Sequence, residues 1–115
     1  YTDLPQANGQ PVVSAVDEQP SFPGGNDRLI DFLASTMYFP VQQGLSAGEG
    51  KCMVEFVVDS EGKVGDISVI EPVSQVVDRE AARVVRLMPR WTPGKRGGQP
   101  VNTRLKLPLV FAAPR

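Results

Sequence analysis

The closing stretch of the chain, residues 100–111, constrains the fold more than any other feature. Its side chains alternate between two kinds, with Val101, Thr103, Leu105, Leu107, Leu109 and Phe111 on one side and Asn102, Arg104, Lys106, Pro108 and Val110 on the other. A period of two predicts a β-strand with one buried face and one basic face. Because Pro108 has no N–H to donate within a sheet, we expect a long edge strand. An open strand edge is a place where another chain can dock.

Helical spacing follows the Pro20-Ser21-Phe22-Pro23-Gly24-Gly25 segment. Asn26 is the expected N-cap of this first helix, and its apolar residues are Leu29, Phe32, Leu33 and Met37. The helix is expected to end at Tyr38-Phe39-Pro40, because the residue before a proline avoids the α region.

Two strands joined by a tight turn are predicted next. Residues 51–59 place Cys52, Val54, Phe56 and Val58 on one face, and residues 64–71 point Ile67 and Val69 inward. The turn is Ser60-Glu61-Gly62-Lys63, in which the glycine supplies a positive φ. Gly65 is a candidate β-bulge.

A second helix is predicted over residues 79–88, with Asp78 as its N-cap and Ala81, Val84, Val85 and Met88 inward. Four arginines, Arg79, Arg83, Arg86 and Arg90, recur at spacings that place them on the opposite face. This secondary basic face is either a solvated outer surface or a contact surface for an anionic glycan, a lipid headgroup or an acidic partner loop.

The order helix, strand, strand, helix, strand predicts an α+β fold: a small antiparallel sheet of three to four strands with two helices packed on one face. Residues 1–19 are expected to be a leader that lies over the fold and has room for one short strand, and residues 20–115 form the single domain. The predicted core collects the apolar halves of each pattern. Its members are Phe32, Leu33, Val54, Phe56, Val58, Ile67, Val69, Val84, Val85, Trp91, Leu105, Leu107 and Leu109.

Composition argues against catalysis. The 115 residues include no histidine, which excludes Ser-His and Cys-His nucleophile pairs and removes the commonest metal ligand. The single cysteine, Cys52, alternates with apolar residues and is expected to be a buried, reduced and functionally silent thiol. Asp59 and Glu61 are interpreted as turn formers rather than calcium ligands. We therefore predict no enzyme, no metal and no cofactor.

The charge is unevenly distributed along the chain. Residues 1–74 hold 11 acidic and 3 basic side chains, whereas residues 75–115 hold 2 acidic and 9 basic ones, and the net charge is −1. Either the two parts compensate each other within one fold, or the basic part faces an anionic partner. A pI of about 5.4 without a basic-aromatic platform argues against nucleic acid.

Several short motifs stand in order between about residue 16 and Phe111. They are Pro20-Ser21-Phe22-Pro23-Gly24-Gly25, Phe39-Pro40, Val54-Glu55-Phe56-Val57-Val58-Asp59-Ser60-Glu61-Gly62-Lys63-Val64, Asp78-Arg79-Glu80-Ala81-Ala82-Arg83-Val84-Val85, Met88-Pro89-Arg90-Trp91-Thr92-Pro93-Gly94-Lys95, Gly98-Gln99-Pro100-Val101 and Leu107-Pro108-Leu109-Val110-Phe111. With these motifs, the sequence resembles the C-terminal domain of TonB-type energy transducers, in the variety common among Bacteroidetes. It departs from the common pattern at Phe39-Pro40, where relatives have Tyr-Pro, and at Gln42-Gln43-Gly44, which supplies no alanine.

The resemblance implies a non-catalytic periplasmic domain, anchored to the inner membrane in the full-length protein. Such a domain docks the TonB box of an outer-membrane transporter as an added strand beside its final strand, and inner-membrane motor proteins supply proton-driven force through the preceding part of the chain. The expected partner-binding residues are Asn102, Thr103, Arg104, Leu105, Lys106 and Leu107. An alternative is the same module as the docking or sensor domain of a membrane-anchored regulator or peptidase.

Two further expectations concern the chain as a whole. Tyr1 is not an initiator residue, so we expect a piece of a longer chain whose targeting segment lies elsewhere. An open strand edge also favours a homodimer of the isolated domain.

Overall fold

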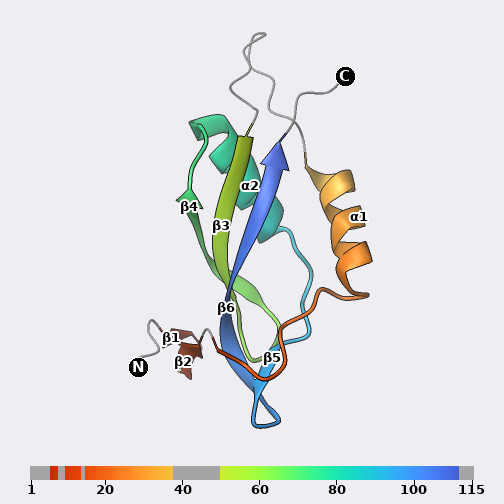
Figure 1. Cartoon of the computed structure of the whole chain (residues 1–115), viewed down its shortest axis with the longest axis vertical. Coiled ribbons are helices and arrows are strands. Elements are labelled where there is room, and N and C mark those ends of the chain that lie inside the picture. Colours follow the sequence, from red (N-terminus) through yellow and green to blue (C-terminus); the bar gives the residue numbers. More distant parts are fainter. Residues whose placement is uncertain (1–5, 8–9, 14, 38–49, 112–115) are drawn as a thin grey trace.

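The computed structural model describes residues 6–7, 10–13, 15–37 and 50–111 (Figure 1). Its elements are β1 (Gln6–Ala7), β2 (Gln10–Val13), α1 (Asn26–Thr36), β3 (Gly50–Val58), β4 (Val64–Glu71), α2 (Gln75–Arg86), β5 (Gly94–Arg96) and β6 (Gln99–Phe111). The departures from the TonB pattern at Phe39-Pro40 and Gln42-Gln43-Gly44 lie outside the described residues.

The final strand β6 joins all parts of the sheet. The strand order is β1-β2-β6-β3-β4, and β5 pairs separately with β6. β3 runs antiparallel to β6 from Gly50 opposite Phe111 to Val58 opposite Thr103, whereas β2 pairs with β6 in parallel. The predicted α+β fold with two helices is confirmed, but the sheet is mixed and has six described strands rather than three or four antiparallel ones.

The β3–β4 hairpin closes through the predicted turn. Gly62 has a φ of 86°, and the Asp59 carboxylate accepts hydrogen bonds from the main-chain N–H groups of Glu61 and Lys63, both at 2.9 Å. Asp59 is therefore a turn former here. The bulge expected at Gly65 is present on β4, where the pairing register shifts between Gly65 and Ser68.

Both helices begin at other residues than predicted. Gly25 occupies the N-cap position of α1 and makes no side-chain capping bond, so the assignment of Asn26 as N-cap was wrong. The N-cap of α2 is Ser74, whose hydroxyl accepts from the Val77 N–H at 3.3 Å, so the assignment of Asp78 was also wrong. Helix α2 begins earlier than predicted because the added turn buries Val77 completely.

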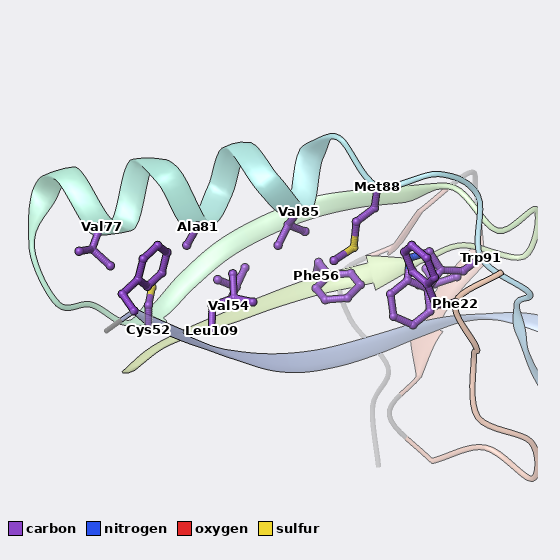
Figure 2. Packing of buried hydrophobic residues seen from close by; sticks show 12 residues of the cluster. Phe22, Cys52, Val54, Phe56, Val77, Ala81, Val85, Met88, Trp91 and Leu109 are labelled. Carbon is purple, nitrogen blue, oxygen red and sulfur yellow. The ribbon is translucent and has the colours of Figure 1, made fainter. Parts of the chain in front are cut away.

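The core lies between α2 and the sheet face formed by β3 and β6 (Figure 2). Trp91 forms edge contacts with Phe22 and with Phe56, with ring centroids 5.6 Å apart in both pairs. Seven predicted core residues are buried: Val54, Phe56, Val58, Val84, Val85, Trp91 and Leu109. The other six are only partly buried against this cluster: Phe32, Leu33, Ile67, Val69, Leu105 and Leu107.

The described part of the leader belongs to the fold. Val12 and Val13 are buried in β2, and Phe22, just after the leader, is 5% exposed in the core. Between them, the chain is tied to β5 by hydrogen bonds in both directions: Lys95 N–H donates to the Glu18 carbonyl at 2.9 Å, and Glu18 N–H donates to the Lys95 carbonyl at 3.1 Å. The leader, in which one short strand was expected, contributes two described strands, and β2 of these pairs with β6.

Candidate functional site

The direction of the main-chain groups of β6 follows from its pairing with β3. Asp59 N–H donates to the Lys63 carbonyl at 2.9 Å, so it points toward β4. Because N–H groups alternate along a strand, those of Val58 and Phe56 point toward β6. Their partners in β6, Thr103 and Leu105, face β3 in return. The intervening residues of β6 present their N–H and C=O groups to the opposite edge, here called the outer edge.

The pairing with β5 leads to the same assignment. The Lys95 N–H points away from β6, since it donates to the Glu18 carbonyl. The main-chain groups of Gly94 and Arg96 therefore face β6, where these residues pair with Val101 and Gln99. The odd-numbered residues of β6 therefore face β5 and then β3 along one edge. The even-numbered residues face the outer edge, and among them are Pro100 and Pro108. Neither proline removes a hydrogen bond from the domain's own sheet. The prediction of a long edge strand was wrong for the first half of β6, which lies between β2 and β3.

Among the described residues, only the beginning of the outer edge is paired with another strand. β2 pairs there with Asn102 and Thr103, opposite Val12 and Val13. Beyond Arg104, no strand in the described part of the chain pairs with it, and residues 105–111 form what we call the open edge. Its outward main-chain groups are the N–H and C=O of Lys106 and Val110 and the C=O of Pro108.

The six residues of the predicted partner-binding site have different surroundings. Asn102 and Thr103 are fully buried, and the Asn102 side-chain oxygen accepts from the Ser60 N–H at 2.8 Å. Arg104 forms an ion pair with Glu55 at 3.2 Å. Leu105 and Leu107 are partly buried against the core, whereas Lys106 is exposed. The second half of the predicted site lies along the open edge, and there only Lys106 turns its main-chain groups outward.

An apolar groove that no sequence pattern indicated adjoins this edge. It has a volume of about 460 Å³ and lies between α1 and the end of β6. Its lining residues are Ile30, Leu33, Ala34, Met37, Pro108, Leu109 and Val110, and we call it the α1–β6 groove. In Figure 1, α1 runs beside β6 on the side away from β3. The sequence patterns of α1 and β6 do not indicate that these two elements meet. The one signal is Ile30, an apolar residue that lies outside the predicted apolar stripe of α1.

A comparison with models of protein families shows the family of this chain. The model described as Gram-negative bacterial TonB protein C-terminal matches residues 35–113, which is more than half of the chain. The chain belongs to the TonB C-terminal family. TonB C-terminal domains are non-catalytic, periplasmic protein-interaction domains that interact with outer-membrane transporters. No curated protein matches the sequence significantly. Within the described ranges of this TonB C-terminal domain, no helix is long and apolar enough to cross a membrane.

The four arginines of the secondary basic face do not share one role in this TonB C-terminal domain. Arg83 contacts both carboxylate oxygens of Glu80, at 2.8 and 2.7 Å, and donates to the Thr36 carbonyl at 2.7 Å, which links α2 to the end of α1. Arg90 lies beyond the helix and donates to the Glu61 carbonyl at 3.3 Å. Arg79 and Arg86 are exposed, and contact with an anionic partner stays a prediction for this face.

Cys52 is buried, as predicted, and is 0% exposed on β3. Its sulfur lies 3.6 Å from Oδ1 of Asp78, which also accepts from the Val73 N–H at 2.9 Å. Burial, the Asp78 charge and the hydrogen bond from the Cys52 thiol to Asp78 raise the pKa of the Cys52 thiol to about 11. Among the residues described, no group of three or more Cys, Asp or Glu side chains could hold a metal ion.

Proposed function

We propose that this domain is the periplasmic receptor-binding end of a TonB-type energy transducer. It docks the TonB box of an outer-membrane transporter by strand addition to the outer edge of β6. The observation that carries this proposal is the open edge, which offers outward main-chain donors and acceptors at Lys106 and Val110. Strand addition uses such groups for affinity, and each added hydrogen bond contributes roughly 0.5–1.5 kcal/mol, which suits a reversible joint.

The sequence predicts the docking register at residues 102–107, and the structure suggests where along β6 it begins. Asn102 and Thr103 already pair with β2, whose Val12 and Val13 are buried. Displacing β2 would expose both valines, and burial of one valine contributes about 1.5–3 kcal/mol. We therefore propose that β2 stays in place and that the transporter strand adds beyond it, from about Leu105 toward Val110.

Coupling to the proton motive force requires a mechanical link from the preceding part of the chain to β6. The described leader supports such a link. Besides the pairing of β2 with β6, Arg96 donates to the Ala15 carbonyl at 2.8 Å, and the Gly97 N–H donates to the Asp17 carboxylate at 2.6 Å. In the full-length protein, we propose an inner-membrane anchor, and motor proteins whose pull reaches β6 through these contacts.

A titration of the ¹⁵N-labelled domain with synthetic TonB-box peptides from transporters of the source organism tests the proposal. We expect amide shifts concentrated between Lys106 and Val110, and a scrambled peptide of the same composition should cause none. Shifts confined to the arginines of α2, or the absence of shifts with every peptide, would contradict docking at β6.

A further inference from the structure

α1 leaves apolar surface exposed beside the open edge. No residue of α1 is fully buried, whereas α2 buries four. In the described part of the chain, four large apolar side chains are exposed, and two of them, Ile30 at 62% and Val110 at 66%, line the same groove. Exposed apolar side chains gathered at one concave site indicate a contact surface more strongly than scattered ones.

In the described part of the chain, every residue that lines the α1–β6 groove is apolar. Leu109, which is 1% exposed, belongs to its strand side together with Pro108 and Val110. The helix side is formed by Ile30, Leu33, Ala34 and Met37. Because these described lining residues carry no charge, they would penalise a charged side chain by desolvation and would favour an apolar one.

The groove is continuous with the place where a strand would be added. Paired strands lie about 4.8 Å apart, so a strand on the open edge passes alongside Pro108 and Val110, which also line the groove. Successive side chains of that strand point to opposite faces, and every second one can reach the space next to α1.

Because of Pro108, a side-chain contact contributes more to the binding of an added strand here than elsewhere along the open edge. The outer edge offers no N–H there, so an added strand forms one main-chain hydrogen bond fewer beside Pro108 than beside Lys106. Burial of an apolar side chain in the adjoining groove can offset that loss. In strand addition, main-chain bonds provide affinity, and pockets for alternate side chains provide specificity.

We propose that the α1–β6 groove is the specificity subsite of the strand-addition site and takes one large apolar side chain of the transporter segment. This inference rests on the proposed function, since the occupant arrives as part of the added strand. The groove thus selects among extended segments by the residue that lies beside Pro108 and Val110.

A double-mutant cycle between domain and peptide tests this inference. The domain variants are Ile30→Ala and, as the control, Leu87→Ala, which removes a side chain of similar exposure, 55%, at the end of α2. The probes are synthetic TonB-box peptides in which each apolar residue is replaced in turn by alanine, and affinities are measured by calorimetry. Because Ile30 is largely exposed, its substitution should leave the domain folded, which circular dichroism can verify.

We expect Ile30→Ala to weaken binding of the unmodified peptide about three- to tenfold. When the peptide residue that occupies the groove is replaced by alanine, Ile30→Ala should have no further effect. Leu87→Ala should bind every peptide like the wild type. If Ile30→Ala binds all peptides normally while Lys106→Pro does not, the groove is not a subsite although strand addition holds. If no peptide binds the wild type, both proposals fail. If Ile30→Ala instead dissociates a dimer in sedimentation and leaves peptide affinity unchanged, the occupant is a second copy and the inference is wrong.

Discussion

The main chain of Trp91 is fitted against Gly62 at the tip of the β3–β4 hairpin. The Trp91 N–H donates to the Gly62 carbonyl at 2.8 Å, and the Trp91 carbonyl oxygen occupies the position that a Cβ at residue 62 would need. Gly62 also has a φ of 86°, which side-chain-bearing residues rarely adopt. The glycine of the predicted turn therefore has a second role, because it lets the segment after α2 close over the hairpin.

Gly62→Ala should be strongly destabilising for this reason. The added methyl group collides with a main-chain atom, and alanine is also strained at this φ, so we expect a loss of roughly 2–4 kcal/mol in the free energy of unfolding. Urea denaturation measures the loss. Gly97→Ala is the matched control, because Gly97 also has a positive φ, 60°, but a Cβ there meets nothing within 4 Å. Equal losses in the two variants would show that the contact with Trp91 is unimportant.

Phe56→Ala should remove the centre of the core. The Phe56 side chain is 0% exposed and packs edge-on against Trp91. Truncation of a fully enclosed phenylalanine costs roughly 3–5 kcal/mol, because the cavity left behind closes only in part. Thermal and urea unfolding measure the change. Ile70→Ala is the control on β4, where the side chain is 39% exposed and should matter much less. Wild-type stability of the Phe56 variant would contradict its place in the core.

The fold was predictable wherever one local pattern determined the structure. The alternation along β6 and β3 predicted their buried faces, and the glycine at position 62 predicted the hairpin. The helix starts were not predictable in this way, since Ser74 and Asp78 are both good capping residues and tertiary burial of Val77 decides between them. α1 also buries its apolar stripe less fully than its periodicity suggested.

The candidate site was predictable only in part, because its remaining features depend on distant segments. The pairing of β2 with Asn102 and Thr103 joins residues about ninety positions apart through a two-residue register, which no local period reveals. The α1–β6 groove likewise needs a helix and a strand from opposite ends of the chain. Pro108, by contrast, was identifiable as an outer-edge residue because it has no N–H to donate to a neighbouring strand, and Lys106, two positions earlier, points its main-chain groups to the same side.

Cys52 should be inert in the native protein. Its sulfur is buried, and its pKa near 11 lies above the ordinary value of 9.0, so the folded protein keeps a proton that the unfolded chain releases. The resulting stabilisation is complete below pH 9 and is lost as the pH rises from 9 to 11. We expect the free energy of unfolding to fall more steeply over this range in the wild type than in Cys52→Ala, with equal peptide affinity at pH 7. Rapid labelling of the native thiol at pH 8 would contradict its burial.

β2 should remain on β6 when the transporter segment binds. Its pairing partners, Asn102 and Thr103, are fully buried, and the proposed added strand begins beyond them. The Val13 N–H points toward the outward-facing Asn102, whereas the N–H of Val12 points away from β6. Hydrogen exchange of the Val13 amide should therefore be as slow in the peptide complex as in the free domain. Loss of protection at this amide on binding would show that the partner strand replaces β2. In that case, a variant lacking residues 1–13 would bind more tightly than the full chain.

Lys106→Pro should separate main-chain recognition from side-chain recognition. If a strand adds along the open edge, proline at this position removes an outward N–H that the partner uses, and peptide affinity should fall at least about fivefold. The proline should leave the domain's own sheet intact, since Lys106 faces away from β3.

Lys106→Ala is the matched control: it removes only an exposed charge and should change affinity less than about twofold. Leu105→Pro differs in kind, because Leu105 faces β3, and this variant should unfold rather than lose binding alone. A folded Lys106→Pro variant that binds TonB-box peptides like the wild type would show that strand addition does not occur at this edge.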